Sequence, residues 1–94
     1  MNFSRESSIL NVMEPIVSNL FDDNYVKTNS LKCSCEKCKM DIILLTLNHV
    51  SPHYTSTQAG EAYIKALFLN PQLQSDVLRE IIQSVKIIEE HPNH

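Results

Sequence analysis

Three cysteines lie within six residues of this chain, at Cys33, Cys35 and Cys38, and the 94-residue sequence contains no others. The Cys-x-Cys-x-x-Cys spacing brings three sulfur atoms close together without help from distant parts of the fold. Thiolate is a preferred protein ligand of zinc, which takes four ligands in a tetrahedral arrangement. The pattern therefore predicts a zinc ion held by these three sulfurs and one further ligand.

Two other interpretations of the cysteines are free thiols and a redox pair. Cysteines that act only as small apolar side chains are usually buried, but these three have polar neighbours: Lys32, Ser34, Glu36, Lys37 and Lys39. A redox Cys-x-x-Cys motif usually lies beside a βαβ unit, and this sequence does not predict one. A redox role for Cys35 and Cys38 is therefore less favoured. A structural zinc is favoured because Cys35 and Cys38 begin a predicted helix, where the helix dipole favours thiolate.

Four histidines compete for the fourth ligand position. His49 lies eleven residues beyond Cys38 in the same predicted helix, roughly 16 Å away at about 1.5 Å per residue, so neither it nor His53 can reach the metal within one subunit. His91 and His94 lie after the last predicted helix and are the remaining histidine candidates. In an up-and-down bundle the fourth helix ends near the end of the second. Either histidine then needs a different topology or must come from a partner subunit. The remaining candidates are carboxylates at the end of the first predicted helix, Asp22 and Asp23.

The spacing of apolar residues predicts an all-α domain of four helices and no strand. The first predicted helix covers residues 7–22 and is followed by a loop at 23–34. The second begins between Cys35 and Lys37 and ends at about Asn48. The third and fourth cover residues 58–69 and 71–90. Pro15 either kinks the first helix or lies in its first turn. Thr57 and Asn70 are predicted N-caps. The second helix is apolar on nearly all sides, which predicts that it is central or also faces a second subunit.

Composition excludes several classes of protein. The chain is 43% hydrophobic and 20% charged, which is typical of one globular domain, here residues 1–94. Its net charge of −3 argues against direct binding of nucleic acid. The longest apolar run, Met40–Leu47, is too short to span a bilayer. We recognise no signal peptide and therefore expect a cytoplasmic protein, whose thiols stay reduced.

An ordered series of short motifs covers residues 11 to 94 and resembles the ComFB family, named for a late competence development protein. The motifs are Asn11-Val12-Met13-Glu14, Cys33-Ser34-Cys35-Glu36-Lys37-Cys38-Lys39-Met40-Asp41-Ile42, Leu45-Thr46-Leu47-Asn48, Val50-Ser51-Pro52-His53-Tyr54, Gly60-Glu61-Ala62-Tyr63 and His91-Pro92-Asn93-His94. The resemblance implies a small helical homodimer with zinc on the cysteine cluster and no known enzymatic activity. Because the family often ends in a similar Pro-x-His sequence, it also favours His94, and then His91, as the fourth zinc ligand. This chain departs from the family pattern at Pro15 and in lacking a fourth cysteine near its C-terminus.

Three functional hypotheses follow. Some ComFB-like proteins are described as receptors for cyclic dinucleotides such as cyclic di-GMP, so the first is a non-enzymatic regulatory receptor or adaptor. The alternative is a protein-binding scaffold linked to competence and DNA uptake, without a small-molecule ligand. A small zinc enzyme ranks last, because no acid–base partner for a zinc-bound water is evident. Sites for cyclic dinucleotides usually use arginine for phosphate, and this chain has only Arg5 and Arg79. A rim for a ligand or partner is an alternative to helix capping for four polar residues: Asn48, Tyr54, Glu61 and Tyr63.

Overall fold

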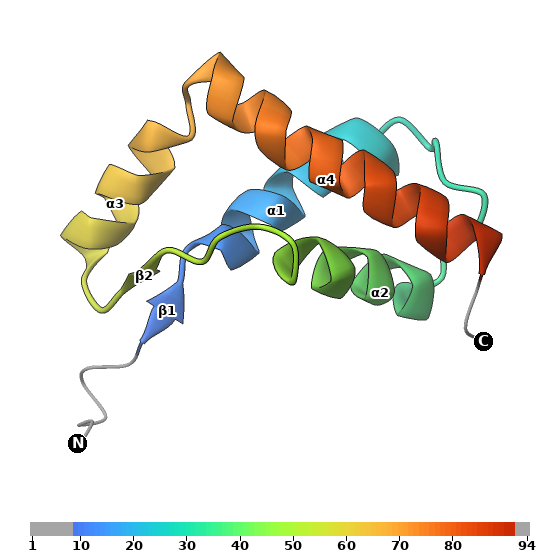
Figure 1. Ribbon diagram of the computed structural model, residues 1–94, viewed down its shortest axis with the longest axis horizontal. Coiled ribbons are helices and arrows are strands. Elements are labelled where there is room, and N and C mark those ends of the chain that lie inside the picture. The colour runs from blue at the N-terminus through green and yellow to red at the C-terminus, as the bar shows by residue number, and fades with distance from the viewer. Residues whose placement is uncertain (1–8, 92–94) are drawn as a thin grey trace.

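Four α-helices and two short strands form the described part of the chain, residues 9–91 of the computed structural model (Figure 1). Their order is β1 (Leu10–Asn11), α1 (Met13–Phe21), α2 (Glu36–Leu47), β2 (Tyr54–Thr55), α3 (Gln58–Leu67) and α4 (Pro71–Glu90). A π-helical turn, η1 (Asp22–Val26), continues α1. The predicted second, third and fourth helices are therefore confirmed, with Thr57 and Asn70 as N-caps of α3 and α4.

The start of the chain differs from the prediction. The helix expected from residue 7 begins only at Met13, with Pro15 in its first turn. Before it, β1 pairs with β2 in antiparallel register, Leu10 with Thr55 and Asn11 with Tyr54, although no strand was predicted. The Asn11 side chain accepts the backbone N–H groups of Met13 and His53, at 3.2 and 3.0 Å. The bond from His53, 42 positions away, favours an extended backbone here over another turn of helix.

The predicted loop at 23–34 is wrong in its first part. Residues 22–26 form η1 because two of its side chains, Tyr25 and Val26, pack against the core. The ring of Tyr25 stacks on that of Phe21 at 5.9 Å, and the Asn24 side-chain amide donates to the Leu20 carbonyl at 2.8 Å. Asn29 then takes a positive φ of 54° and ends the helical path. The polar composition of this segment therefore did not indicate that Tyr25 and Val26 attach it to the core.

Helices α2 and α4 run antiparallel, as Figure 1 shows. Two pairs of contacts establish this direction: Lys32 with Glu89 near one end, and Thr46 with Ser84 further along. The topology therefore deviates from a simple up-and-down bundle, in which these helices would be parallel. The reason is α3, which lies to one side of the other helices and buries only Ile64. The C-terminal end of α4 thus lies near the beginning of α2.

The core lies where α1, α2 and α4 meet. Its buried apolar side chains are Val12, Met13, Ile16, Val17, Phe21, Ile42, Ile64, Val77, Ile81 and Val85. Two buried polar residues bridge the helices inside it. The Thr46 hydroxyl lies 2.8 Å from the Ile42 carbonyl and 2.9 Å from the Ser84 hydroxyl. This pairing satisfies both hydroxyls, so their burial does not leave unpaired polar groups.

Helix α2 is not buried on all sides within one chain. Its buried side chains are Cys38, Ile42 and Thr46, whereas Met40 is 54% and Leu44 is 51% exposed. Of the two predicted alternatives, a central position with burial on all sides is therefore not seen within one chain, and contact with a second subunit stays a prediction. No helix within residues 9–91 combines the length and apolar character that crossing a bilayer requires.

Gly60 lies where the fold leaves no room for a Cβ atom. A Cβ atom here would overlap the Thr55 hydroxyl and lie 3.0 Å from the Thr57 hydroxyl. The Thr57 hydroxyl cannot easily move, because it caps α3 by accepting the Gly60 N–H at 2.9 Å.

We expect Gly60→Ala to lower the free energy of unfolding by about 1 kcal/mol. Overpacking costs about 1–3 kcal/mol, and the better helix propensity of alanine returns about 1 kcal/mol. Chemical denaturation measures the change. In a Thr55→Ala background the loss should be smaller, because only the 3.0 Å contacts with the Cβ of residue 55 and the Thr57 hydroxyl remain, and an equal loss in both backgrounds would contradict this explanation.

Candidate metal centre

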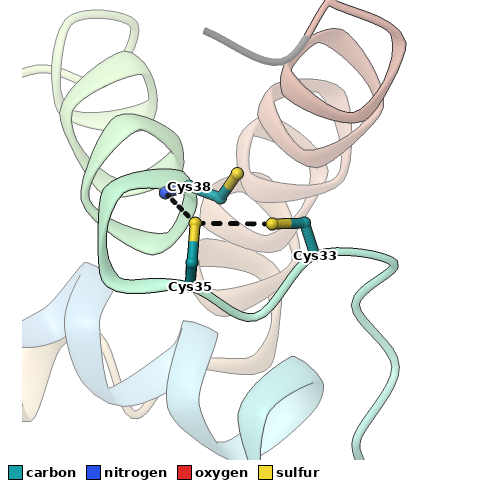
Figure 2. Close-up of side chains that lie close together, drawn as sticks. All are labelled: Cys33, Cys35 and Cys38. Atoms are coloured by element: carbon teal, nitrogen blue, oxygen red, sulfur yellow. Dashed lines mark hydrogen bonds between the residues drawn. The ribbon is translucent and has the colours of Figure 1, made fainter. Parts of the chain in front are cut away.

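The three cysteine sulfurs gather at the beginning of α2 (Figure 2). They all lie within 4.8 Å of one another, and the Cys33 and Cys35 sulfurs are 3.4 Å apart. Around a tetrahedral zinc ion with Zn–S bonds of about 2.3 Å, neighbouring sulfurs are about 3.8 Å apart. The sulfurs therefore need only small movements to bind one metal ion together. The described structure confirms that the cysteines predicted to share a site do lie together.

Each cysteine has a different structural setting. Cys33 is half-buried in the segment before α2, Cys35 is exposed, and Cys38 is only 3% exposed. Cys35 is the N-cap of α2, with extended backbone angles, and its sulfur accepts the backbone N–H of Cys38 at 3.4 Å. It thus takes the place that serine or aspartate usually occupies. The local Cys-x-x-Cys spacing therefore both starts the helix and aims Cys38 toward the other sulfurs.

The local electrostatics make the thiols unequal. The pKa of the Cys35 thiol is lowered, chiefly because its sulfur accepts the backbone N–H of Cys38. The pKa of the Cys38 thiol is raised to about 12, first by its hydrogen bond with the Cys33 sulfur and then by burial. A bound cation would lower the pKa of the Cys38 thiol again, because it stabilises thiolate over thiol. Three sulfurs within 4.8 Å of one another could therefore hold a metal ion.

Glu89 connects this cluster to the far end of the chain. Its carboxylate accepts the backbone N–H of Lys32, the residue before Cys33, at 2.7 Å. The last turn of α4 is thereby held beside the cysteine segment, although 57 positions separate the two residues. Sequence analysis did not identify Glu89, because a lone glutamate near the end of an amphipathic helix gives no signal of a distant backbone partner.

The candidate fourth ligands differ in where they lie relative to the cysteines. Within residues 9–91, no histidine, aspartate or glutamate joins the three cysteines in a potential metal-binding group. Asp22 and Asp23 lie 3.7 and 3.0 Å from the Lys27 ammonium. His91 is exposed and follows directly after α4. His94 lies outside the described residues, so its predicted role as a ligand stays a prediction.

His49 and His53 lie beyond the C-terminal end of α2, whereas the cysteines lie at its beginning, as the length of this helix predicted. A groove of about 310 Å³ lies beyond the C-terminal end of α2, between the segment before β2 and helix α4. Its apolar lining consists of Met13, Val50, Phe68, Leu73 and Val77. Its titratable lining consists of His49, His53, Asp76, Arg79 and Glu80. The His53 ring meets the Phe68 ring edge-on, with centroids 5.4 Å apart.

Comparison with known proteins identifies relatives of this chain. The family model "Late competence development protein ComFB" matches residues 10–92. The competence protein ComFB of Bacillus subtilis (strain 168) is 29% identical over 85 residues, which cover 90% of this chain and 86% of that protein. A solved structure of the late competence protein ComFB from Bacillus subtilis matches with a TM-score of 0.80 and 29% identity, covering 92% of this chain and 93% of the other. Because the family model spans most of the chain, and the fold agrees as well, this protein belongs to the ComFB family.

Proposed function

We propose that this protein is a non-catalytic regulatory adaptor whose fold is held together by one structural zinc ion. The observation that carries this proposal is the gathering of three sulfurs within 4.8 Å of one another. The ComFB family is not a known enzyme family. Thiolate ligands favour zinc among the common divalent ions, and the expected cytoplasmic location keeps the thiols available. Titrating metal-free protein with zinc tests the proposal, with one ion per chain expected and no binding contradicting it.

The fourth ligand is proposed to be His94, with His91 as the second choice. The antiparallel arrangement of α2 and α4 supports a ligand from the C-terminal end of the same chain, since the last turn of α4 contacts Lys32 through Glu89. Cobalt in place of zinc gives a visible spectrum that reports ligand type and geometry. We expect His94→Ala to change this spectrum and His91→Ala to leave it unaltered. The opposite result would assign the position to His91.

Zinc affinity is predicted to rise with pH. With a pKa of about 12, the metal-free Cys38 thiol is protonated near neutral pH. Zinc binds thiolate, so binding through Cys38 releases at least one proton, and acid weakens binding by mass action. Competition titrations between about pH 6 and pH 8 should therefore show at least a tenfold gain in affinity per pH unit. Cys38→Ser should reduce this dependence, and an affinity independent of pH would rule out Cys38 as a ligand.

The protein is further proposed to form a homodimer through the exposed face of α2. Met40 and Leu44 stand one helical turn apart on this face and are each about half exposed. Burying such apolar side chains between subunits is favourable. Leu44→Lys is expected to give monomers in native mass spectrometry. Leu69→Lys is the matched control, because Leu69 is equally apolar and lies at the C-terminal end of α3, away from this face.

For the regulatory ligand, a cyclic dinucleotide such as cyclic di-GMP is proposed, and the groove beyond α2 has suitable chemistry. Phe68 and the His53 ring offer aromatic surface for a base, and the Arg79 guanidinium suits a phosphate. The carboxylates of Asp76 and Glu80 are acceptors for the N–H groups of guanine. One Arg79 per chain is few for two phosphates, and a dimer supplies two.

Titration calorimetry with cyclic di-GMP tests this ligand. We expect saturable heat, with Arg79→Ala weakening binding at least about tenfold, or about 1.4 kcal/mol. Lys86→Ala is the control, because Lys86 is an exposed cation on the same helix that does not line the groove. Absence of heat at high micromolar ligand would leave the alternative, a protein-binding scaffold linked to competence. That alternative predicts co-purification with competence proteins in the absence of nucleotide.

A further inference from the structure

The geometry of the three sulfurs points to an oxidation site, beyond metal binding itself. We infer that a hydroperoxide oxidises Cys35, that Cys33 then closes a Cys33–Cys35 disulfide, and that the metal ion is thereby expelled. The inference shares its cysteines with the proposed zinc site. It rests on sulfur positions and access within the described residues, and the disulfide itself does not require that a metal was bound before.

Cys35 is the sulfur that an oxidant in solution can reach. It is exposed, whereas Cys33 is half-buried and Cys38 is only 3% exposed. As the N-cap of α2, Cys35 also holds its sulfur at the surface in a fixed orientation, through the bond from the Cys38 N–H at 3.4 Å. Susceptibility of a cysteine to oxidation follows exposure and thiolate character. Cys35 is therefore the first site of attack.

Cys33 is the partner best placed to resolve the oxidised sulfur. Its sulfur lies 3.4 Å from that of Cys35, and a disulfide bond requires about 2.0 Å. Cys33 belongs to no helix or strand, so its segment can close this gap by local rotation, whereas Cys38 lies inside α2 with its side chain buried. A Cys35–Cys38 disulfide is the competing outcome, because the Cys38 sulfur also lies within 4.8 Å of that of Cys35, but Cys38 is held in the core at 3% exposure.

The proposed chemistry balances in two steps. The Cys35 thiolate attacks the terminal oxygen of the hydroperoxide; an S–O bond forms, the O–O bond breaks, and the alcohol (water, for hydrogen peroxide) leaves with the available proton. The Cys33 sulfur then attacks the Cys35 sulfenic acid; an S–S bond forms, the S–O bond breaks, and the hydroxyl leaves as water with the Cys33 proton. Two thiols are oxidised and one hydroperoxide is reduced. A disulfide is reversed by thiol exchange.

Oxidation removes two of the three proposed sulfur ligands. Cys38 is then the one remaining sulfur ligand, and a closed structural zinc site requires four protein ligands. The segment between η1 and α2, which the metal would hold at the beginning of α2, is consequently released. The site would therefore convert exposure to peroxide into loss of zinc.

Peptide mapping of the wild-type protein decides which disulfide forms. Trypsin cuts after Lys32, Lys37 and Lys39, so Cys33 and Cys35 share one peptide and Cys38 lies in the next. After treatment of the folded protein, as purified, with hydrogen peroxide, we expect the peptide of residues 33–37 to lose two hydrogen atoms and to stay separate. A cross-link to the peptide of residues 38–39 would overturn the assignment to Cys33, and unchanged peptides would overturn the inference as a whole.

Variants and zinc release separate this inference from the proposed metal site. Cys38→Ser should still form the disulfide, whereas Cys33→Ser should stop at a sulfenic acid that a dimedone probe captures. In zinc-loaded wild type, a colorimetric indicator should detect one zinc ion released per disulfide, and a dithiol should restore binding. A disulfide in a protein that never binds zinc would refute the metal site alone. Zinc retained while the disulfide forms would refute the proposed release.

Discussion

Cys35→Ser is expected to remove the bound metal and to lower the free energy of unfolding by about 5 kcal/mol or more. Structural zinc contributes about 10–16 kcal/mol of apparent folding free energy in zinc-finger peptides. The effect should be smaller here because α1, α2 and α4 bury an apolar core of their own. Native domains are stable by only about 5–15 kcal/mol, so a loss of this size removes a large part of the stability and should lower the helical content of the variant at physiological temperature.

The loss has a local cause that can be followed by experiment. Cys35 is both a proposed ligand and the cap of α2, and it orders the segment between η1 and α2. Far-UV circular dichroism together with metal content per chain should show helicity and zinc disappearing together. Ser34→Ala is the control, because Ser34 is exposed between two of the cysteines and is not a proposed ligand. Wild-type protein that carries no metal when purified without chelator, and is nevertheless fully folded, would contradict the stabilising role of zinc.

Ile81→Ala is expected to lower the free energy of unfolding by about 2–5 kcal/mol, the range for deleting large aliphatic core side chains. Ile81 is 0% exposed and belongs to the cluster where α4 packs on α1 and α2. The surrounding helices cannot collapse fully into the space left behind, so a cavity adds to the loss of buried apolar area.

The neighbouring Ile82 supplies a close control for this substitution. It is 54% exposed on the same helix, and Ile82→Ala changes helix propensity by the same amount. The difference between the two variants in urea denaturation therefore isolates burial. We expect Ile82→Ala to stay within about 0.5 kcal/mol of wild type, as is usual for surface positions. Equal losses at both positions would show that this part of α4 does not form the core described here.

The helices and the cysteine cluster could be predicted because they depend on neighbours in sequence. Asn70-Pro71 begins α4 and Thr57 begins α3 through caps that span two or three residues. The sulfurs of Cys33, Cys35 and Cys38 come together because five positions separate the first from the last. Local backbone geometry is sufficient for each of these features, so residue type and spacing carry the information.

Other features were decided only when distant segments packed together. The β1–β2 pairing depends on Asn11 meeting His53, and η1 depends on Tyr25 reaching the core. The antiparallel direction of α2 and α4 follows from the position of α3, which places Glu89 beside Lys32. A local pattern does not specify which neighbouring helix an amphipathic helix will pack against, because the apolar burial that stabilises the pair is non-directional. The sequence alone thus determined the helices and the sulfur cluster, whereas tertiary packing decided that the C-terminal end of α4 lies beside that cluster.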